Sequence, residues 1–439
     1  MKRRIVSFLV ILSVFFTTDA KEKNKEDFYR NFSDSTLRID YTFGGGPDGI
    51  LLFLDGQTKQ NGWAGRYNHL KNTPLKGNGN ILVLDVESGD TLYNNCFSTL
   101  FQEWLCTPEA QEKSMSFQNS FLVPLPIKEA IIKVSLRDNK HNEIASLQHK
   151  YRPDDELVRK VKHSPLPHKY VHKGNDTNAI DLAILAEGFT QKEMGEFLES
   201  AEQISDEILK YEPFSSNKDK FNIVAVMTPS EESGVSIPLK DLWINTRYGS
   251  HFSTFYSDRY LTSPRVHKMH EDLEGIPYEY ILMIVNTPEY GGGGIFNNYQ
   301  IASSKNKFTL PVAVHEFGHS FGGLADEYDY GDDETDLTYP NGIEPWEPNI
   351  TTLVDFQSKW NDKLTPGIPI PTPWEKKPLQ RNADLNINEM PIGAYEGAGY
   401  RQKGIFRPSE SCRMRDNYFP VFCKICEDSI LETINFYTD

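Results

Sequence analysis

The segment 315–328, which reads His-Glu-Phe-Gly-His-Ser-Phe-Gly-Gly-Leu-Ala-Asp-Glu-Tyr, constrains this chain more than any other stretch. On an α-helix, residues four apart lie on the same face, so His315 and His319 can direct ring nitrogens at one ion. Two imidazoles suit zinc, which prefers tetrahedral nitrogen, sulfur or carboxylate ligands. Glu316 lies one residue from the first histidine, where the motif implies a general base that takes a proton from a metal-bound water. The segment therefore predicts a helix that carries a zinc site.

The residues after the second histidine indicate where a third ligand lies. Gly322 and Gly323 favour the end of the helix, because glycine enters the left-handed conformation at little cost. A sharp turn there swings the chain back toward the ion. The His-Glu-x-x-His-x-x-Gly-x-x-His pattern of metzincins would place a third histidine at position 325, which is alanine here. Asp326 is therefore the first choice for the third ligand and Glu327 the second; an ordinary amphipathic helix with two histidines is the alternative.

The chain resembles the IgA-peptidase family of secreted bacterial zinc metallopeptidases. The resemblance rests on the segment 315–328, on Ile-Leu-Ala-Glu-Gly-Phe-Thr at 184–190, and on Gly-Ala-Tyr-Glu-Gly-Ala-Gly-Tyr at 393–400 followed by Ser-Cys-Arg-Met at 411–414. It implies a metzincin-like catalytic domain, zinc-dependent endopeptidase chemistry and an N-terminal β-rich domain. It does not specify the substrate.

Two further roles come from the same resemblance. Met414 matches the tight methionine turn that lies under the zinc histidines in metzincins, where the methionine packs beneath the metal without binding it. The matching Tyr-Glu-Gly-Ala-Gly-Tyr stretch suggests that Tyr395 or Tyr400 donates a hydrogen bond to the tetrahedral oxyanion.

The chain divides into three parts by composition. Residues 1–20 read as a signal peptide, with a basic start, an apolar run that is too short to span a bilayer, and small residues near position 20. Residues 21–160 hold short strands separated by turns, which predicts an N-terminal β-sandwich domain. Residues 161–439 form the expected zinc metallopeptidase catalytic domain. The mature chain is thus expected to be exported to the periplasm, the cell surface or the medium.

The expected fold class is α+β, because buried strands alternate with helices in the catalytic part. One helix follows Thr190 with apolar residues at three- and four-residue spacing, and the zinc helix supplies another. The chain 295–302 is expected to be the edge strand along which a substrate pairs, with the preceding glycines either allowing close approach or forming a plain loop. Strands are expected at 36–43, 50–54, 81–86, 130–136, 143–147, 180–185, 221–226 and 280–285.

The five cysteines leave several arrangements open. In an oxidising compartment Cys96 and Cys106 either pair or remain thiols. In the C-terminal part, a bridge joins either Cys412 to Cys423 or Cys423 to Cys426. No structural zinc is expected here, because no further ligand pair is evident in the sequence.

Charge and hydropathy limit the classes of partner that this chain is expected to bind. A formal net charge of −16 repels phosphate backbones, so nucleic acid is excluded as a partner. After the leader, no segment is apolar enough to be transmembrane. The expected function is a secreted zinc endopeptidase that cleaves protein or peptide substrates; the oligomeric state is left open. The alternatives are a non-catalytic surface binding protein on a peptidase fold and a zinc amidase that acts on cell-wall peptides.

Overall fold

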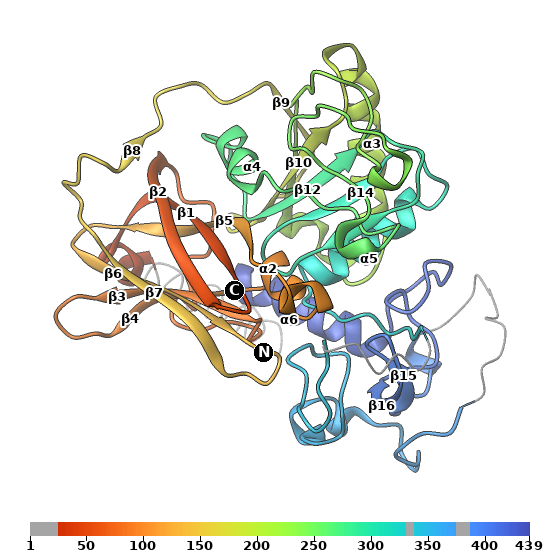
Figure 1. The fold of residues 1–439 in the computed structure, drawn as a ribbon. Coiled ribbons are helices and arrows are strands. Elements are labelled where there is room, and N and C mark those ends of the chain that lie inside the picture. The colour runs from red at the N-terminus through yellow and green to blue at the C-terminus, as the bar shows by residue number, and fades with distance from the viewer. Residues whose placement is uncertain (1–24, 331–337, 375–386) are drawn as a thin grey trace, which may run out of the picture.

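The computed structural model describes residues 25–330, 338–374 and 387–439, and the predicted signal peptide 1–20 lies outside these ranges. The described chain folds into several sheets with few helices (Figure 1), which confirms the α+β class. Its helices are α2 (Leu100–Leu105), α3 (Met194–Ile208), α4 (Val266–Asp272), α5 (Thr309–Ser320) and α6 (Lys424–Thr438).

The N-terminal half consists of two four-stranded sheets that share one apolar core. Alternation builds this core: Ile81 and Val83 are buried in β3, whereas Leu82 between them is half-buried. One sheet has the order β5-β1-β2-β8 and the other β4-β3-β6-β7. The strands are β1 (Phe32–Gly46), β2 (Gly49–Asn61), β3 (Gly79–Asp85), β4 (Thr91–Phe97), β5 (Met115–Pro126), β6 (Ala130–Arg137), β7 (Glu143–Tyr151) and β8 (Arg159–Lys160).

The C-terminal half contains a six-stranded mixed sheet with the order β13-β14-β12-β10-β11-β9. Its four inner strands are parallel, and the two outer strands, β13 and β9, run antiparallel to their neighbours. A separate hairpin joins β15 to β16. The strands are β9 (His168–Lys173), β10 (Ile180–Glu187), β11 (Phe221–Val226), β12 (Tyr280–Val285), β13 (Gly292–Gly294), β14 (Gln300–Ser303), β15 (Tyr395–Ala398) and β16 (Arg401–Arg407).

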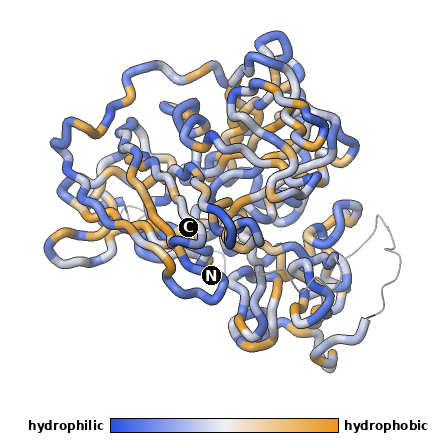
Figure 2. The backbone as a smooth tube through the Cα atoms, viewed as in Figure 1, coloured by the Kyte–Doolittle hydropathy of each residue, from blue (hydrophilic) through white to orange (hydrophobic). Residues whose placement is uncertain are grey.

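Both faces of the mixed sheet are buried, as near-continuous apolar strands require. In β10, Leu182 and Ile184 belong to the core that contains α3, α5 and α6, whereas Ala183 and Leu185 belong to the core that contains α4. Figure 2 shows apolar residues concentrated on the strands of both halves. Helix α3 buries residues at the predicted spacing, which confirms its apolar face: Met194, Phe197, Ala201, Ile204 and Ile208.

Helix α5 packs against the mixed sheet beside β14 and β13. It runs from Thr309 to Ser320, with Phe308 at the N-cap position. The helix ends as predicted: Gly323 has a φ of 59°, its N–H donates to His319 O, and Leu324 N–H donates to Gly318 O. This sharp ending returns the chain toward the two histidines.

The predicted edge strand at 295–302 is wrong in its position. The outer strand is β13 itself, and the chain after Gly294 turns before β14 begins. A Cβ added to Gly294 would lie 2.5 Å from Glu316 O and 3.0 Å from His319 Cβ. Only glycine lets the strand approach α5 this closely. Part of its outer side is covered, because Leu261 N–H donates to Gly292 O at 3.4 Å.

The two halves touch beside α5. Ser98 N–H donates to Phe296 O at 2.9 Å, and the Asn297 side chain donates to Cys96 O at 2.8 Å. A buried ion pair links Arg38 to Glu274 at 2.9 Å. The N-terminal half therefore forms one wall of the region in front of α5. Among the residues given coordinates here, no helix has the length and apolar character needed to cross a bilayer.

Candidate active site

Three side chains that the sequence singled out come together at one point. His315 and His319 lie one turn apart on α5, and Asp326 follows the glycine turn. The Nε2 atoms of the two histidines are 3.1 Å apart. Asp326 Oδ1 lies 2.9 Å from His315 Nε2 and 3.3 Å from His319 Nε2. His315 and Asp326 are buried, so these atoms face one another with little water between them.

Each of these three side chains is oriented by a hydrogen bond to an atom that faces away from the other two. His315 Nδ1 lies 3.1 Å from Arg413 O, and His319 Nδ1 lies 2.5 Å from Leu324 O. A carbonyl only accepts, so each Nδ1 carries a proton, and Nε2 offers a lone pair whenever the ring is neutral. The Tyr400 hydroxyl donates to Asp326 Oδ2 at 2.6 Å, which turns Oδ1 toward the histidines.

The separations fit a tetrahedral cation. With metal–ligand distances near 2.0–2.1 Å, the edge of a zinc tetrahedron is about 3.3–3.4 Å long. The three observed edges of the His315, His319 and Asp326 triangle are 2.9, 3.1 and 3.3 Å. The donor set of two nitrogens and one carboxylate oxygen is one that zinc accepts.

The same triangle perturbs the acids and bases around it. Burial alone would lower the pKa of His319, but the carboxylates of Asp326 and Glu316 raise it to about 9. Burial would raise the pKa of Asp326, but the two histidines hold it well below its ordinary value. Burial raises the pKa of Glu316, partly offset by the histidines. Perturbed pairs of this kind in a cleft are typical of functional sites.

Glu316 lies beside the triangle and lines a cleft of about 950 Å³. The edge strand approaches it so closely that a Cβ on Gly292 would lie 2.7 Å from its Oε1. The cleft is also lined by residues from the N-terminal half and from the loops after α5. A carboxylate thus faces a space large enough for a peptide segment, next to the three ligand atoms.

Met414 lies beneath the histidine-bearing helix. It is fully buried, and a Cβ on Gly318 would lie 2.6 Å from its Sδ. The residue before it, Arg413, supplies the carbonyl that orients His315. The turn around Met414 therefore supports α5 from below and fixes one ligand.

Two residues that the sequence offered as alternatives for the site have other contacts in the structure. Glu327, the second choice for the third ligand, points away from the histidines toward Cys426, with Oε1 3.1 Å from that sulfur. Tyr395 was wrong as an oxyanion donor, because its hydroxyl donates to Pro391 O at 3.3 Å and the residue does not line the cleft. The Tyr400 hydroxyl is committed to Asp326.

Several cleft residues carried no recognisable sequence signal. Glu103 comes from α2 in the N-terminal half; the Tyr260 hydroxyl donates to it, and burial raises its pKa to about 7. Arg259 donates to the Tyr328 hydroxyl at 3.3 Å at the mouth of the cleft. Glu103, Arg259 and Tyr260 lie in no motif. Tyr328 ends the segment 315–328, but nothing in that segment assigned it a role.

Comparisons with known proteins identify the family of the chain. The sequence matches the family described as IgA Peptidase M64 over residues 169–390 and 384–434, and the one described as Peptidase M64 N-terminus over residues 27–148. No curated protein shows significant similarity to the chain. The crystal structure of metalloproteinase-II from Bacteroides fragilis is 7% identical, with 58% of this chain and 85% of that chain covered and a TM-score of 0.21. A likeness that weak carries no argument about fold or function. The family matches cover most of the chain, which confirms the resemblance seen in its motifs: the chain belongs to the M64 family of IgA peptidases.

Proposed function

We propose that this peptidase is a zinc-dependent endopeptidase, exported by its N-terminal leader, with a metzincin-like catalytic domain. One observation carries the proposal: the ligand atoms of His315, His319 and Asp326 meet at tetrahedral spacing, with Glu316 beside them in an open cleft. The substrate is a protein or peptide, as membership of a peptidase family implies. The methionine turn under α5 and the edge strand beside it support the metzincin-like assignment.

His315, His319 and Asp326 would hold the ion and leave a fourth position open to the cleft. Zinc bound there supplies a Lewis acid that polarises the scissile carbonyl and lowers the pKa of water. The Glu316 carboxylate accepts the proton of the attacking water and delivers it to the leaving nitrogen. Because burial raises the pKa of Glu316, the group exchanges protons closer to neutral pH than an exposed glutamate does.

Side chains on the wall of the cleft can stabilise the oxyanion that forms during hydrolysis. Arg259 and Tyr328 form a hydrogen-bonded pair on the wall near Asp326, and both are donors. We assign to this pair the stabilisation of the oxyanion that the sequence had assigned to Tyr395 or Tyr400. A donor aimed at developing charge in a dry site is worth about 10²–10³-fold in rate.

Substitution of the general base tests the proposal. Glu316→Ala should retain the zinc content of the parent and lower the rate of casein cleavage by about 10²–10⁴-fold. Glu199→Ala, which changes an exposed glutamate on α3, is the matched control and should cleave as fast as the parent. Cleavage by Glu316→Ala at the parental rate would contradict the mechanism.

The same assay separates the alternative functions. Protein substrates and peptidoglycan fragments are offered to the parent enzyme side by side. Release of peptides from casein, and none from peptidoglycan, is expected for an endopeptidase. Hydrolysis of the fragments alone would favour the amidase, and no hydrolysis of either by zinc-loaded protein would favour the binding protein.

A further inference from the structure

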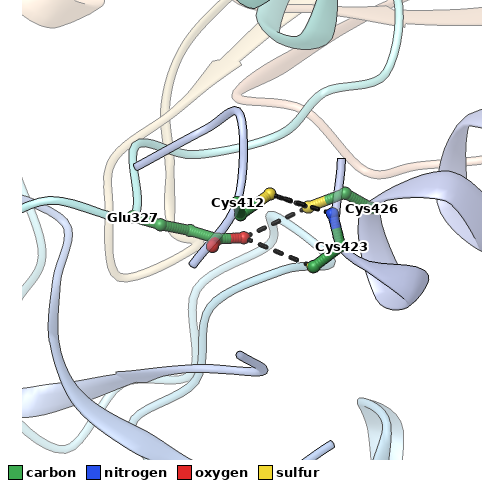
Figure 3. A group of neighbouring side chains, drawn as sticks. All are labelled: Glu327, Cys412, Cys423 and Cys426. Atoms are coloured by element: carbon green, nitrogen blue, oxygen red, sulfur yellow. Dashed lines mark hydrogen bonds between the residues drawn. The ribbon is translucent and has the colours of Figure 1, made fainter. Parts of the chain in front are cut away.

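A second group of potential metal ligands is buried behind the active site. It consists of Glu327, Cys412, Cys423 and Cys426, which are drawn in Figure 3. Glu327 follows the catalytic-site aspartate, Cys412 precedes the methionine turn, Cys423 is the N-cap of α6 and Cys426 lies in its first turn. None of the four is more than 2% exposed. Three segments that are distant in the sequence thus contribute one polar cluster to the apolar core.

The distances within this cluster fit a tetrahedral thiolate site. A zinc ion with Zn–S distances near 2.3 Å separates two sulfurs by about 3.8 Å. The Sγ atoms of Cys412 and Cys426 are 3.7 Å apart. Glu327 Oε1 lies 3.1 Å from Cys426 Sγ and 3.9 Å from Cys423 Sγ, and a mixed oxygen–sulfur edge is about 3.5 Å. All four ligand atoms lie within 4.8 Å of one another.

Disulfide pairing does not describe this geometry. A disulfide requires two sulfurs at about 2.05 Å, far shorter than the 3.7 Å between Cys412 and Cys426. All five cysteines lie in the described residues, and no disulfide joins any two of them there. Neither bridge that the sequence left open, Cys412 to Cys423 or Cys423 to Cys426, is present among those residues.

The surroundings suit charged ligands. The backbone N–H groups of Cys423 and Met414 donate to Cys412 Sγ at 3.1 and 3.4 Å, and such bonds stabilise a thiolate. Asn349 donates to Glu327 Oε1 at 2.9 Å and so orients the carboxylate. Within the described part of the chain, Glu327 Oε2 is buried with no hydrogen-bond partner. An unpaired buried carboxylate is costly, and a cation removes that cost.

Positive charge is also provided nearby. Three thiolates and one carboxylate carry four negative charges, of which a divalent ion neutralises two. The guanidinium groups of Arg407 and Arg415 interact electrostatically with Glu327, and Arg407 is fully buried. They offset part of the remaining negative charge, which they share with Asp329 and Glu410.

We propose that Glu327, Cys412, Cys423 and Cys426 bind one zinc ion as a closed structural site, distinct from the catalytic one. Three soft thiolates select zinc over calcium or magnesium. All four positions are filled by protein, as in structural zinc sites, and binding releases the three thiol protons to solvent. The inference does not rest on the proposed catalytic function.

Such an ion would stabilise the segments that support the proposed catalytic site on the side away from the cleft. Glu327 is bonded in sequence to Asp326, and its N–H donates to Met414 O at 2.9 Å. Cys412 lies two residues before Met414. A metal that joins the loop of Glu327, the methionine turn and α6 would therefore fix Asp326 and the floor under α5 together.

Metal analysis of the full mature chain, purified without chelator, tests the site. The parent should contain two zinc ions per chain, Cys426→Ser one, and His319→Ala one. Cys96→Ser changes a buried cysteine remote from the cluster and should keep two. One zinc in the parent and none in His319→Ala would overturn the proposal, whatever the catalytic result.

A second measurement needs no substitution in the cluster. Cobalt exchanged into the parent should give thiolate-to-cobalt charge-transfer absorption, which the sulfur-free catalytic site does not produce. His319→Ala should retain this absorption even though its proteolysis is lost. Absence of the absorption in the fully loaded parent would overturn the proposal. So would native peptide mapping that finds a Cys412–Cys426 or Cys423–Cys426 disulfide.

Discussion

Tyr400 shows how one residue outside the ligand set can control it. Its hydroxyl donates to Asp326 Oδ2, so Oδ1 faces the two Nε2 atoms. The backbone at Tyr400 has a φ of 68°, a conformation that L residues adopt rarely, and this conformation accompanies the inward position of the ring. We regard Tyr400 as a positioning residue for the third ligand.

Tyr400→Phe should therefore weaken zinc binding by about 10–100-fold, the usual cost of losing a hydrogen bond to a ligand. Zinc affinity is measured by competition with a chelator, and kcat is measured at saturating zinc. Tyr395→Phe is the control, because its hydroxyl bonds Pro391 O outside the cleft. An unchanged zinc affinity with a large loss of kcat would mean that Tyr400 acts on the substrate instead.

The choice between Asp326 and Glu327 also belongs to the residue scale. Both carboxylates follow the glycine turn, and sequence spacing ranked them without separating them. The structure separates them by the groups that each side chain contacts. Asp326 faces the histidines, and Glu327 faces the cysteines.

At the scale of elements, β13 and α5 pack unusually closely against each other. The strand consists of three glycines, and two of them would place a Cβ against α5. The sequence left these glycines as either a segment that allows close approach or a plain loop, because a side-chain pattern cannot be read where there are no side chains. Their close packing against the helix is a tertiary property.

Gly294→Val should disrupt this contact. The added side chain would meet Glu316 O and His319 Cβ, so β13 must move away from the helix at a cost of about 1–3 kcal/mol. We expect a lower thermal unfolding temperature and a loss of kcat/KM. Gly195→Ala on α3 is the control, since open space surrounds its Cβ, and it should be neutral or stabilising. Parental activity in Gly294→Val would show that the approach of β13 does not matter.

At the scale of the whole molecule, the N-terminal half forms part of the cleft that holds the candidate active site. Helix α2 brings Glu103 from that half into the cleft. The halves are joined by Arg38–Glu274 and by backbone hydrogen bonds beside α5. The boundary between the ranges 21–160 and 161–439 remains a prediction.

Metal should stabilise the whole fold in a pH-dependent way. In the metal-free protein the pKa of His319 is raised from 6.5 to about 9. This raised pKa favours the metal-free fold most fully below pH 6.5, and the benefit is lost as pH rises through about 9. Zinc requires the deprotonated ring, so its affinity weakens by up to about tenfold, or 1.4 kcal/mol, per pH unit below 9.

The two effects change in opposite directions: as pH rises through about 9, the metal-free fold loses the contribution of His319 while the affinity for zinc increases. The rise in unfolding temperature on adding zinc to chelator-treated protein should be larger at pH 8 than at pH 6. Scanning calorimetry at fixed free zinc measures this difference. In His319→Ala the part of the pH dependence that comes from this ring should disappear. An equal zinc effect at both pH values in the parent would contradict a proton-competitive site.

The sequence by itself determined what local pattern controls. It predicted the helix with His315, Glu316 and His319, its glycine ending, the α+β class, and the strands β10, β11 and β12. These follow from spacing on a helix and from apolar runs, which depend on neighbours in the chain. Tertiary structure decided which acid faces the histidines, that Glu103 enters the cleft, and that Glu327 joins three cysteines. Those outcomes depend on contacts between distant segments, which no local period encodes.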